Sequence, residues 1–141
     1  MIFIPGQVPS LKNSKVKGIY HPVTVTKYLR SLGIQGYSAS EKTVKEYKDP
    51  NRPNLFRKYV GNYFEGAEYP IVLGFHFVRG RRGSWDIGNA QHILLDLLTA
   101  HDLIQDDNAD CLIPQSFKID GRWYSYSKER PGVYLKILGD E

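Results

Sequence analysis

The sequence contains little cysteine and no long hydrophobic run, and each absence excludes a class of protein. The single cysteine, Cys111, excludes an internal disulfide and a zinc site built from several cysteines. The longest apolar run is of the type IVLGFHFV, which is too short to span a membrane, and no charged-then-apolar signal peptide opens the chain. We therefore expect a soluble, cytoplasmic protein that does not bind membranes.

Repeats, low-complexity segments and linkers are also absent from the sequence. A chain of 141 residues is long enough for one domain with a hydrophobic core and too short for two. We expect residues 1–141 to form a single domain.

Positive charge is distributed unevenly along the chain. The net charge is +4, but residues 1–60 contain eleven Lys or Arg and three acidic residues, whereas residues 61–141 contain eight and twelve. A basic half attracts polyanions, and an acidic patch repels them unless a cation neutralises it. The distribution favours a metal-dependent enzyme that acts on nucleic acid. A basic, solvated face without a partner is the alternative that charge leaves open.

Hydrophobic periodicity and turn residues predict an α+β domain with a mixed β-sheet and flanking helices. Residues 22–40 mix strand and helix signals. Strands are expected at Met1–Ile4, Tyr69–Val78, Cys111–Ile119 (an edge strand or a bulge, because of Pro114), Gly121–Tyr126 (a hairpin segment) and Gly132–Leu138. Helices are expected at Ser40–Pro50, with Ser38 or Ser40 as cap, at Asn54–Phe64, and in the segment that follows Asp86.

The acidic residues gather in the stretch from Ser84 to Asp110. It contains six of the fifteen acidic residues, all of them aspartates: Asp86, Asp96, Asp102, Asp106, Asp107 and Asp110. Its middle predicts an amphipathic helix, with Asn89, His92 and Asp96 on a polar stripe beside the apolar face. If the chain folds back at Leu103 and Ile104, carboxylates from both ends of this helix could converge with the stripe. Such an arrangement suits a divalent metal ion.

Most of these residues also have a purely structural interpretation. Asp86 or Ser84 could cap the helix by accepting hydrogen bonds from its first turn. Adjacent carboxylates at Asp106 and Asp107 are harder to explain without a cation, because like charges repel. Three further residues are expected at the surface: Asp102, His92 and His101.

Two basic loops could contact phosphates. One follows the first strand and contains Lys12 and Asn13, and the other contains Arg79, Arg81 and Arg82 and leads directly to Asp86. Ammonium, guanidinium and backbone amide groups in such loops bind phosphate oxygens. The alternatives are an exposed connection for the first loop and simple pairing with the nearby aspartates for the second.

The central segment resembles the RusA family of Holliday junction resolvases. In that family a strand and a basic loop lead into Asp-x-Asp-Asn, then into a helix with a lysine and an aspartate, and finally to an Asp-Asp pair. Without a gap, this sequence matches the pattern at Asp86, Asn89, Asp96 and Asp106-Asp107. The opening PSLKNS also resembles the family, whereas residues 20–65 match nothing in it.

Two positions depart from the family pattern. Gly88 replaces the second aspartate, and His92 replaces the lysine. The loss of this aspartate and this lysine would fit either an inactive homologue or a branch of the family that uses different catalytic side chains. The retention of the other matched residues together favours the second interpretation.

The resemblance implies a magnesium-dependent endodeoxyribonuclease, of a phage or prophage type, that resolves four-way DNA junctions in recombination and repair as a homodimer. Mg²⁺, with Mn²⁺ as a possible substitute, would be held by Asp86 and Asp107. Asp106 and His92 would take part in catalysis, with Asn89 and Asp96 in support. The DNA-binding residues would be Lys12, Asn13, Arg79, Arg81 and Arg82. The alternatives are a catalytically impaired protein that binds branched DNA, a metal-dependent nuclease for flaps, forks or RNA, and a structural protein whose acidic segment docks a basic partner.

Overall fold

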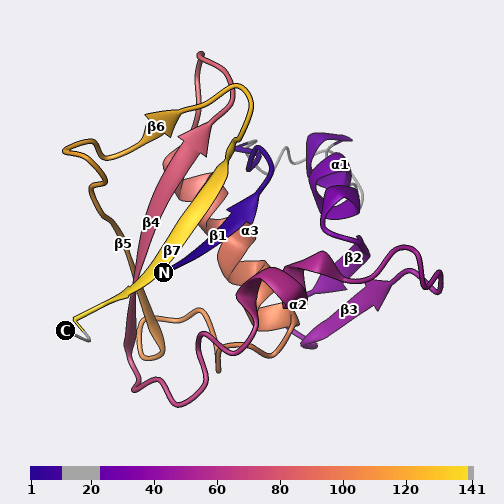
Figure 1. Ribbon diagram of the computed structural model, residues 1–141. Coiled ribbons are helices and arrows are strands. Elements are labelled where there is room, and N and C mark those ends of the chain that lie inside the picture. The colour runs from indigo at the N-terminus through magenta and orange to yellow at the C-terminus, as the bar shows by residue number, and fades with distance from the viewer. Residues whose placement is uncertain (11–22, 140–141) are drawn as a thin grey trace.

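The computed structural model describes residues 1–10 and 23–139, which form an α+β fold with a mixed sheet and three helices (Figure 1). The predicted fold class is confirmed at this level. The strands are β1 (Ile2–Pro5), β2 (Ile34–Ser38), β3 (Thr43–Glu46), β4 (Ile71–Arg79), β5 (Leu112–Ser116), β6 (Ser125–Tyr126) and β7 (Gly132–Leu138), and the helices are α1 (Val23–Ser31), α2 (Leu55–Val60) and α3 (Ile87–Ala100).

The main sheet is built around β4. Its strand order is β1-β7-β4-β5, and β6 also pairs with β4. Strand β7 is antiparallel to β1 and β4, whereas β5 and β6 run parallel to β4. The strand predicted at Tyr69–Val78 is confirmed as β4, and side chains on both of its faces are buried, since every residue from Leu73 to Val78 is buried. The edge position predicted from Pro114 is also confirmed, because β5 ends the strand order.

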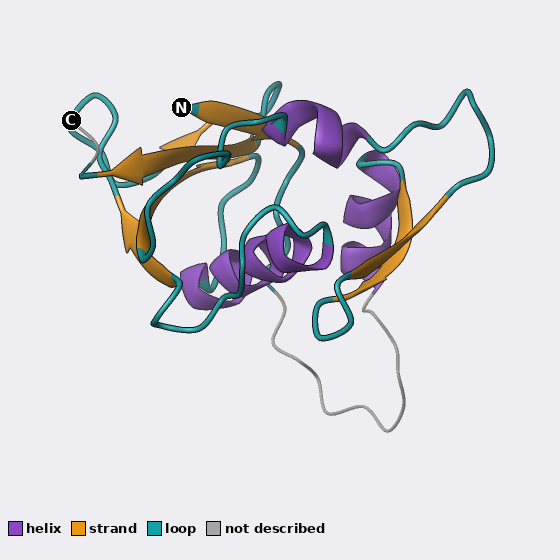
Figure 2. Cartoon of the chain, turned by 90° about the horizontal axis from the view of Figure 1, so that it is seen from below, coloured by secondary structure: helices purple, strands orange, loops and turns teal. Residues whose placement is uncertain are grey.

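Helix α3 lies across one face of the sheet, and α1, α2 and the β2–β3 hairpin lie beside it (Figure 2). Its apolar face is buried as predicted, through Ala90, Ile93, Leu94, Leu97 and Leu98. Among the residues that the structure describes, no helix has the length and apolar character needed to cross a membrane.

Residues 23–65, the described part of the 20–65 segment that lies outside the resemblance, complete the core. Tyr28 and Leu29 of α1, Leu32 after it, and Phe56 and Val60 of α2 are at most 4 % exposed and belong to the same hydrophobic cluster as the sheet. Burial of side chains of this size contributes about 1.5–3 kcal/mol each relative to exposure. This region is therefore an integral part of the fold.

The helix predicted at Ser40–Pro50 is wrong, because this segment forms the second strand of a hairpin. Val44 pairs with Tyr37 and Thr43 pairs with Ser38 across an antiparallel register. The hydroxyl of Ser38 does accept a hydrogen bond from the Glu41 amide at 3.3 Å, but the bond closes a turn. A helix here would have almost no apolar face to bury, and tertiary packing decides whether a short helix forms.

The helix predicted at Asn54–Phe64 is confirmed at its start and is shorter than predicted. Oδ1 of Asn54 caps α2 by accepting from the Arg57 amide at 3.0 Å. The helix ends at Gly61, whose φ of 55° leaves the helical region. Turns follow, and they still bury Phe64.

His101, predicted at the surface, is buried at the end of α3. Its Nδ1–H donates to the Leu97 carbonyl at 2.6 Å, and its Nε2 accepts from the Asn54 amide at 2.9 Å. The ring centroid lies 4.7 Å from that of Phe56. The prediction fails because Asn54 and Phe56 come from the start of α2, and their approach to the end of α3 is not visible in the local sequence. Asp102, by contrast, is exposed as predicted, with Lys42 at 3.4 Å.

Candidate metal centre and basic face

Helix α3 carries the polar stripe predicted from the sequence. It begins at Asp86, whose Oδ1 accepts a hydrogen bond from the Asn89 amide at 3.1 Å. Asn89, His92 and Asp96 follow at spacings of three and four, so they lie on one side of the helix. His92 is exposed, whereas Asn89 and Asp96 are partly buried.

The chain folds back after α3 at the predicted place. Asp102 adopts a φ of 56°, and the Leu103 amide donates to the Leu98 carbonyl at 3.0 Å, which reverses the chain direction. Ile104 is then buried in the core and anchors the returning segment. This reversal brings Asp107 back to the level of the polar stripe.

His92, Asp96 and Asp107 form the one group of potential metal ligands found among the described residues. One donor atom of each lies within 4.8 Å of the other two. Nε2 of His92 lies 3.3 Å from Oδ2 of Asp96. Burial raises the pKa of Asp96, the neighbouring His92 lowers it, and the charge of Asp107 raises it again. A cation would relieve the repulsion between the two carboxylates.

The donor set fits a divalent cation. Two ligands on opposite sides of one Mg²⁺ lie about 4.2 Å apart, because each bond is about 2.1 Å long. Ligands that are not opposite lie closer than this, so the three donors, which lie within 4.8 Å of one another, would have to move closer together to bind one ion. Without an ion, His92 and Asp96 would form an ordinary pair one helical turn apart.

Tyr37 of β2 lies beside this group and was missed by sequence reasoning. Burial raises its pKa, and the charge of Asp96 raises it further. Its position depends on the packing of β2 against α3. No signal in the sequence around Tyr37 indicates that contact.

Asp86 is outside the group that the structure assembles. Its carboxylate caps α3, and it precedes Asp96 by ten residues, or about 15 Å along the helix axis. The structure therefore brings Asp107 to His92 and Asp96, and does not bring Asp86 to this group. A direct role for Asp86 in holding the ion stays a prediction.

Asp106 and Asn89 serve the local structure. Asp106 is exposed, and its Oδ1 accepts from the Asp107 amide at 2.7 Å while its Oδ2 accepts from the Asn108 side chain at 3.2 Å. These hydrogen bonds lower the pKa of Asp106, and the bond from the Asp107 amide has the largest effect. The side-chain amide of Asn89 donates to the Ser10 carbonyl at 3.3 Å and so ties the segment after β1 to α3.

The arginine loop that leads from β4 to α3 contacts aromatic rings. Arg79 donates to the Gly83 carbonyl at 2.6 Å and lies over the Trp85 ring at 5.1 Å. Arg82 lies over the Tyr126 ring at 4.7 Å, and Arg81 is exposed. Within residues 1–10 and 23–139 none of these arginines forms an ion pair with an aspartate, so the pairing alternative is wrong there.

Exposed aromatic residues of the 123–126 segment lie next to the arginine loop. We call the surface formed by the arginine loop and these rings the basic face. Trp123, Tyr124 and Tyr126 are between 38 and 55 % exposed, and Lys118 lies over the Trp123 ring at 4.9 Å. They reach the loop because β6 pairs with the end of β4, Tyr126 opposite Arg79. The sequence shows an aromatic cluster here, but only this pairing places it beside the arginines. Lys12 and Asn13, the other predicted DNA contacts, lie outside the described residues.

A His/Asp/Asp group formed by α3 and the segment that returns after it defines the class of site: a candidate centre for a divalent cation. The arginine loop precedes the same helix. No protein-family model, curated protein or solved structure matches this chain.

Proposed function

We propose that this protein is a divalent-metal-dependent nuclease that cleaves branched DNA, as the resemblance to the RusA resolvases implies. The observation that supports the proposal is the convergence of Asp107 with His92 and Asp96 of α3, the helix that follows the arginine loop. A metal-dependent nuclease uses a cation to activate water and offset charge at the phosphate, and positive charge elsewhere to hold the nucleic acid.

His92, Asp96 and Asp107 would hold the cation in this proposal. When bound, a divalent cation lowers the pKa of a coordinated water and offsets negative charge at a phosphate. Asp106 acts as a positioning residue, because its carboxylate fixes the backbone of Asp107. Asp96, which the resemblance makes a supporting residue, becomes a direct ligand.

The identity of the cation follows from the donor set. Carboxylates suit Mg²⁺ and Mn²⁺, whereas imidazole nitrogen is a poorer ligand for Mg²⁺ than for transition metals. We expect Mn²⁺ to bind more tightly than Mg²⁺ and to support cleavage at a lower concentration.

The basic face would hold the DNA. Arg81 and Arg82 bind phosphates without reading sequence, and exposed rings such as Trp123 stack on unpaired bases near a branch point. A four-way junction has two strands to cut, so two copies of this chain, related by a two-fold axis, would supply the two sites.

The experiment that tests the proposal is cleavage of a synthetic four-way junction. Purified protein is incubated with the junction, a linear duplex of the same sequence, and Mg²⁺, Mn²⁺ or EDTA. We expect nicking near the branch point with either cation and none with EDTA. Asp107→Asn should reduce the rate by about 10²-fold or more, because it removes a charged ligand. Asp110→Asn, an exposed aspartate close by, is the matched control and should cleave normally.

The second candidate is a protein that binds branched DNA without cutting it. Gly88 in place of the family carboxylate, and the distance of Asp86 from the group, favour this alternative. Junction binding without cleavage at any cation concentration, unchanged by Asp107→Asn, would establish it. Flaps, forks and RNA are included in the same series of substrates. Faster cleavage of one of them than of the junction would identify a nuclease with that substrate.

A further inference from the structure

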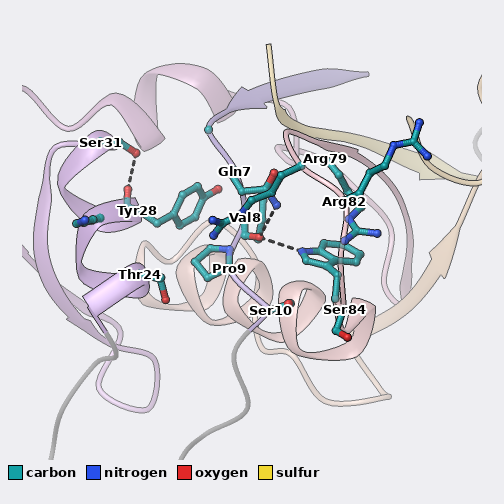
Figure 3. A pocket seen from close by; sticks show the side chains of 14 residues that line it. Gln7, Val8, Pro9, Ser10, Thr24, Tyr28, Ser31, Arg79, Arg82 and Ser84 are labelled. Carbon is teal, nitrogen blue, oxygen red and sulfur yellow. Dashed lines mark hydrogen bonds between the residues drawn. The ribbon is translucent and has the colours of Figure 1, made fainter. Parts of the chain in front are cut away.

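A cavity of about 420 Å³ lies at the N-terminal end of α3, apart from the His/Asp/Asp group. Its walls come from residues 6–10, from α1 and from residues 79–85. Figure 3 shows the segment from Gln7 to Ser10 running between Tyr28 on one side and Arg79 and Arg82 on the other. Cavities of this volume accommodate small organic ligands.

The charge of the cavity wall is entirely positive. Lys27, Arg79, Arg81 and Arg82 contribute to it, and no acidic side chain is among the described residues that line it. Guanidinium groups bind phosphate through paired hydrogen bonds. The cavity is therefore suited to an anion.

Two polar atoms in the wall have no hydrogen-bond partner among the described residues. They are the hydroxyl of Tyr28, a residue that is 4 % exposed, and Nε of Arg79. Figure 3 shows the Tyr28 hydroxyl directed away from α1, toward Gln7 and Val8. Burial raises the pKa of Tyr28, so its hydroxyl is a hydrogen-bond donor. Both atoms are covered by protein, so the charged wall that a ligand meets is formed by the exposed Lys27, Arg81 and Arg82.

The rest of the wall is apolar and partly flat. Val8 and Pro9 are buried, and the Trp85 indole is held in place by donating to the Val8 carbonyl at 3.2 Å. Inorganic phosphate would fill only part of the cavity, because one water occupies about 30 Å³ and phosphate is equivalent to a few waters. A ligand with a phosphate and a ring system would use both the charged and the apolar wall.

We propose that this cavity binds a single nucleotide, with its phosphate at Arg81 and Arg82 and its base against Val8, Pro9 and Trp85. The nucleotide is either free or one unpaired unit of a nucleic acid strand. The second source builds on the proposed nuclease function and specifies how its substrate is held.

The cavity lies next to the start of α3, the helix that carries His92 and Asp96. Trp85 immediately precedes the cap residue Asp86, and the Asn89 side chain bonds to Ser10 of the cavity wall. His92 and Asp96 lie about 9 and 15 Å further along the helix axis.

Fluorescence of Trp85 tests the proposal without any metal. Trp123→Phe leaves Trp85 as the only tryptophan and changes an exposed side chain. In EDTA, this variant is titrated with deoxyadenosine 5′-monophosphate, deoxyadenosine, inorganic phosphate and a short single-stranded oligonucleotide. We expect a saturable change with the monophosphate or the oligonucleotide, at affinities roughly tenfold or more above those for deoxyadenosine and phosphate.

Variants of the cavity wall complete the test. In this background, Arg81→Gln and Arg82→Gln should each weaken binding several-fold, while Lys58→Gln, an exposed residue of α2 outside the cavity, should bind normally. A response to the oligonucleotide alone assigns the cavity to a unit of a strand, and a response to the monophosphate includes the free nucleotide. No response to either, or equal affinity for inorganic phosphate, overturns the proposal. Binding that survives Asp107→Asn separates this result from failure of the nuclease.

Discussion

His101 shows how one side chain can link folding to pH. Burial lowers the pKa of His101, although the hydrogen bond to Leu97 opposes this effect. The neutral ring donates from Nδ1 and accepts at Nε2 from Asn54, whose other contacts are with Glu46 and Arg57. Protonation would place a second donor opposite the Asn54 amide, so the folded protein favours the neutral form.

We expect the free energy of unfolding to fall at acidic pH because of His101. With a folded pKa below the unfolded value of about 6.5, the unfolded chain binds more protons between the two values. The stabilisation is therefore complete above about pH 6.5 and is lost as the pH falls toward the folded pKa. Urea denaturation between about pH 5 and 8 measures the effect. His101→Phe should be less stable at neutral pH and should lose this part of the pH dependence. An unchanged slope in the variant would contradict the assignment.

Metal affinity can distinguish the group that the structure assembles, with Asp96 and Asp107, from the pair that the resemblance implies, Asp86 and Asp107. Asp96→Asn and Asp107→Asn should each lower Mn²⁺ affinity by about tenfold or more, because each replaces a carboxylate of the assembled group with a neutral amide. Asp86→Asn should bind Mn²⁺ normally, and it keeps α3 capped because asparagine is an equally good cap. Isothermal titration calorimetry measures all three, with Asp110→Asn as control. Equal losses for Asp86→Asn and Asp107→Asn would instead support the pair that the resemblance implies.

At the scale of elements, local periodicity predicts a helix or strand whose formation depends on one segment alone. It fails where the structure of a segment depends on pairing with a second segment. The apolar faces of α3 and β7 follow from spacing alone, and so does the polar stripe with His92 and Asp96. The return of Asp107 was predictable from the apolar pair Leu103 and Ile104. The β2–β3 hairpin was not, because strand pairing across a turn outweighs the weak helical propensity of Ser40–Pro50.

The joint between α1 and β2 gives a prediction about an element boundary. Gly33 has a φ of 76°, and a Cβ there would clash with the Pro53 carbonyl oxygen just before α2. Gly66 has a similar φ of 73° but faces open space. Gly66→Ala should cost about 1 kcal/mol through backbone strain alone. Gly33→Ala should cost on the order of 1–3 kcal/mol more, because the joint must also move.

Urea denaturation of both variants measures the difference. Equal losses would show that the contact between Gly33 and the Pro53 backbone is unimportant and that only the positive φ matters. A larger loss for Gly33→Ala would show that α1, β2 and α2 are held together at this point.

On the scale of the whole molecule, chain topology brings together groups that are far apart in the sequence. The parallel pairing of β6 with β4 places Tyr126 opposite Arg79, and the cap of α3 follows the arginine loop directly. The candidate metal group lies further along the same helix. A second set of basic residues, on the β2–β3 hairpin and just after it, is supplied by Lys42, Lys45 and Lys48 and is also exposed. Charge alone therefore allows two DNA-binding faces.

The salt dependence of junction binding can decide between these faces. Each phosphate contact that is lost reduces the slope of log K against log salt by about 0.9 for duplex DNA. If DNA lies on the arginine loop, the double variant Arg81→Gln/Arg82→Gln should reduce the slope by about 2, uniformly across DNA sequences. Lys45→Gln/Lys48→Gln removes the same charge from the hairpin and the segment after it, so it controls for the change in net charge. Fluorescence anisotropy in EDTA over a range of salt concentrations gives both slopes. A reduction confined to the lysine variant would place the DNA on the hairpin side, and the arginine loop would then have no role in holding it.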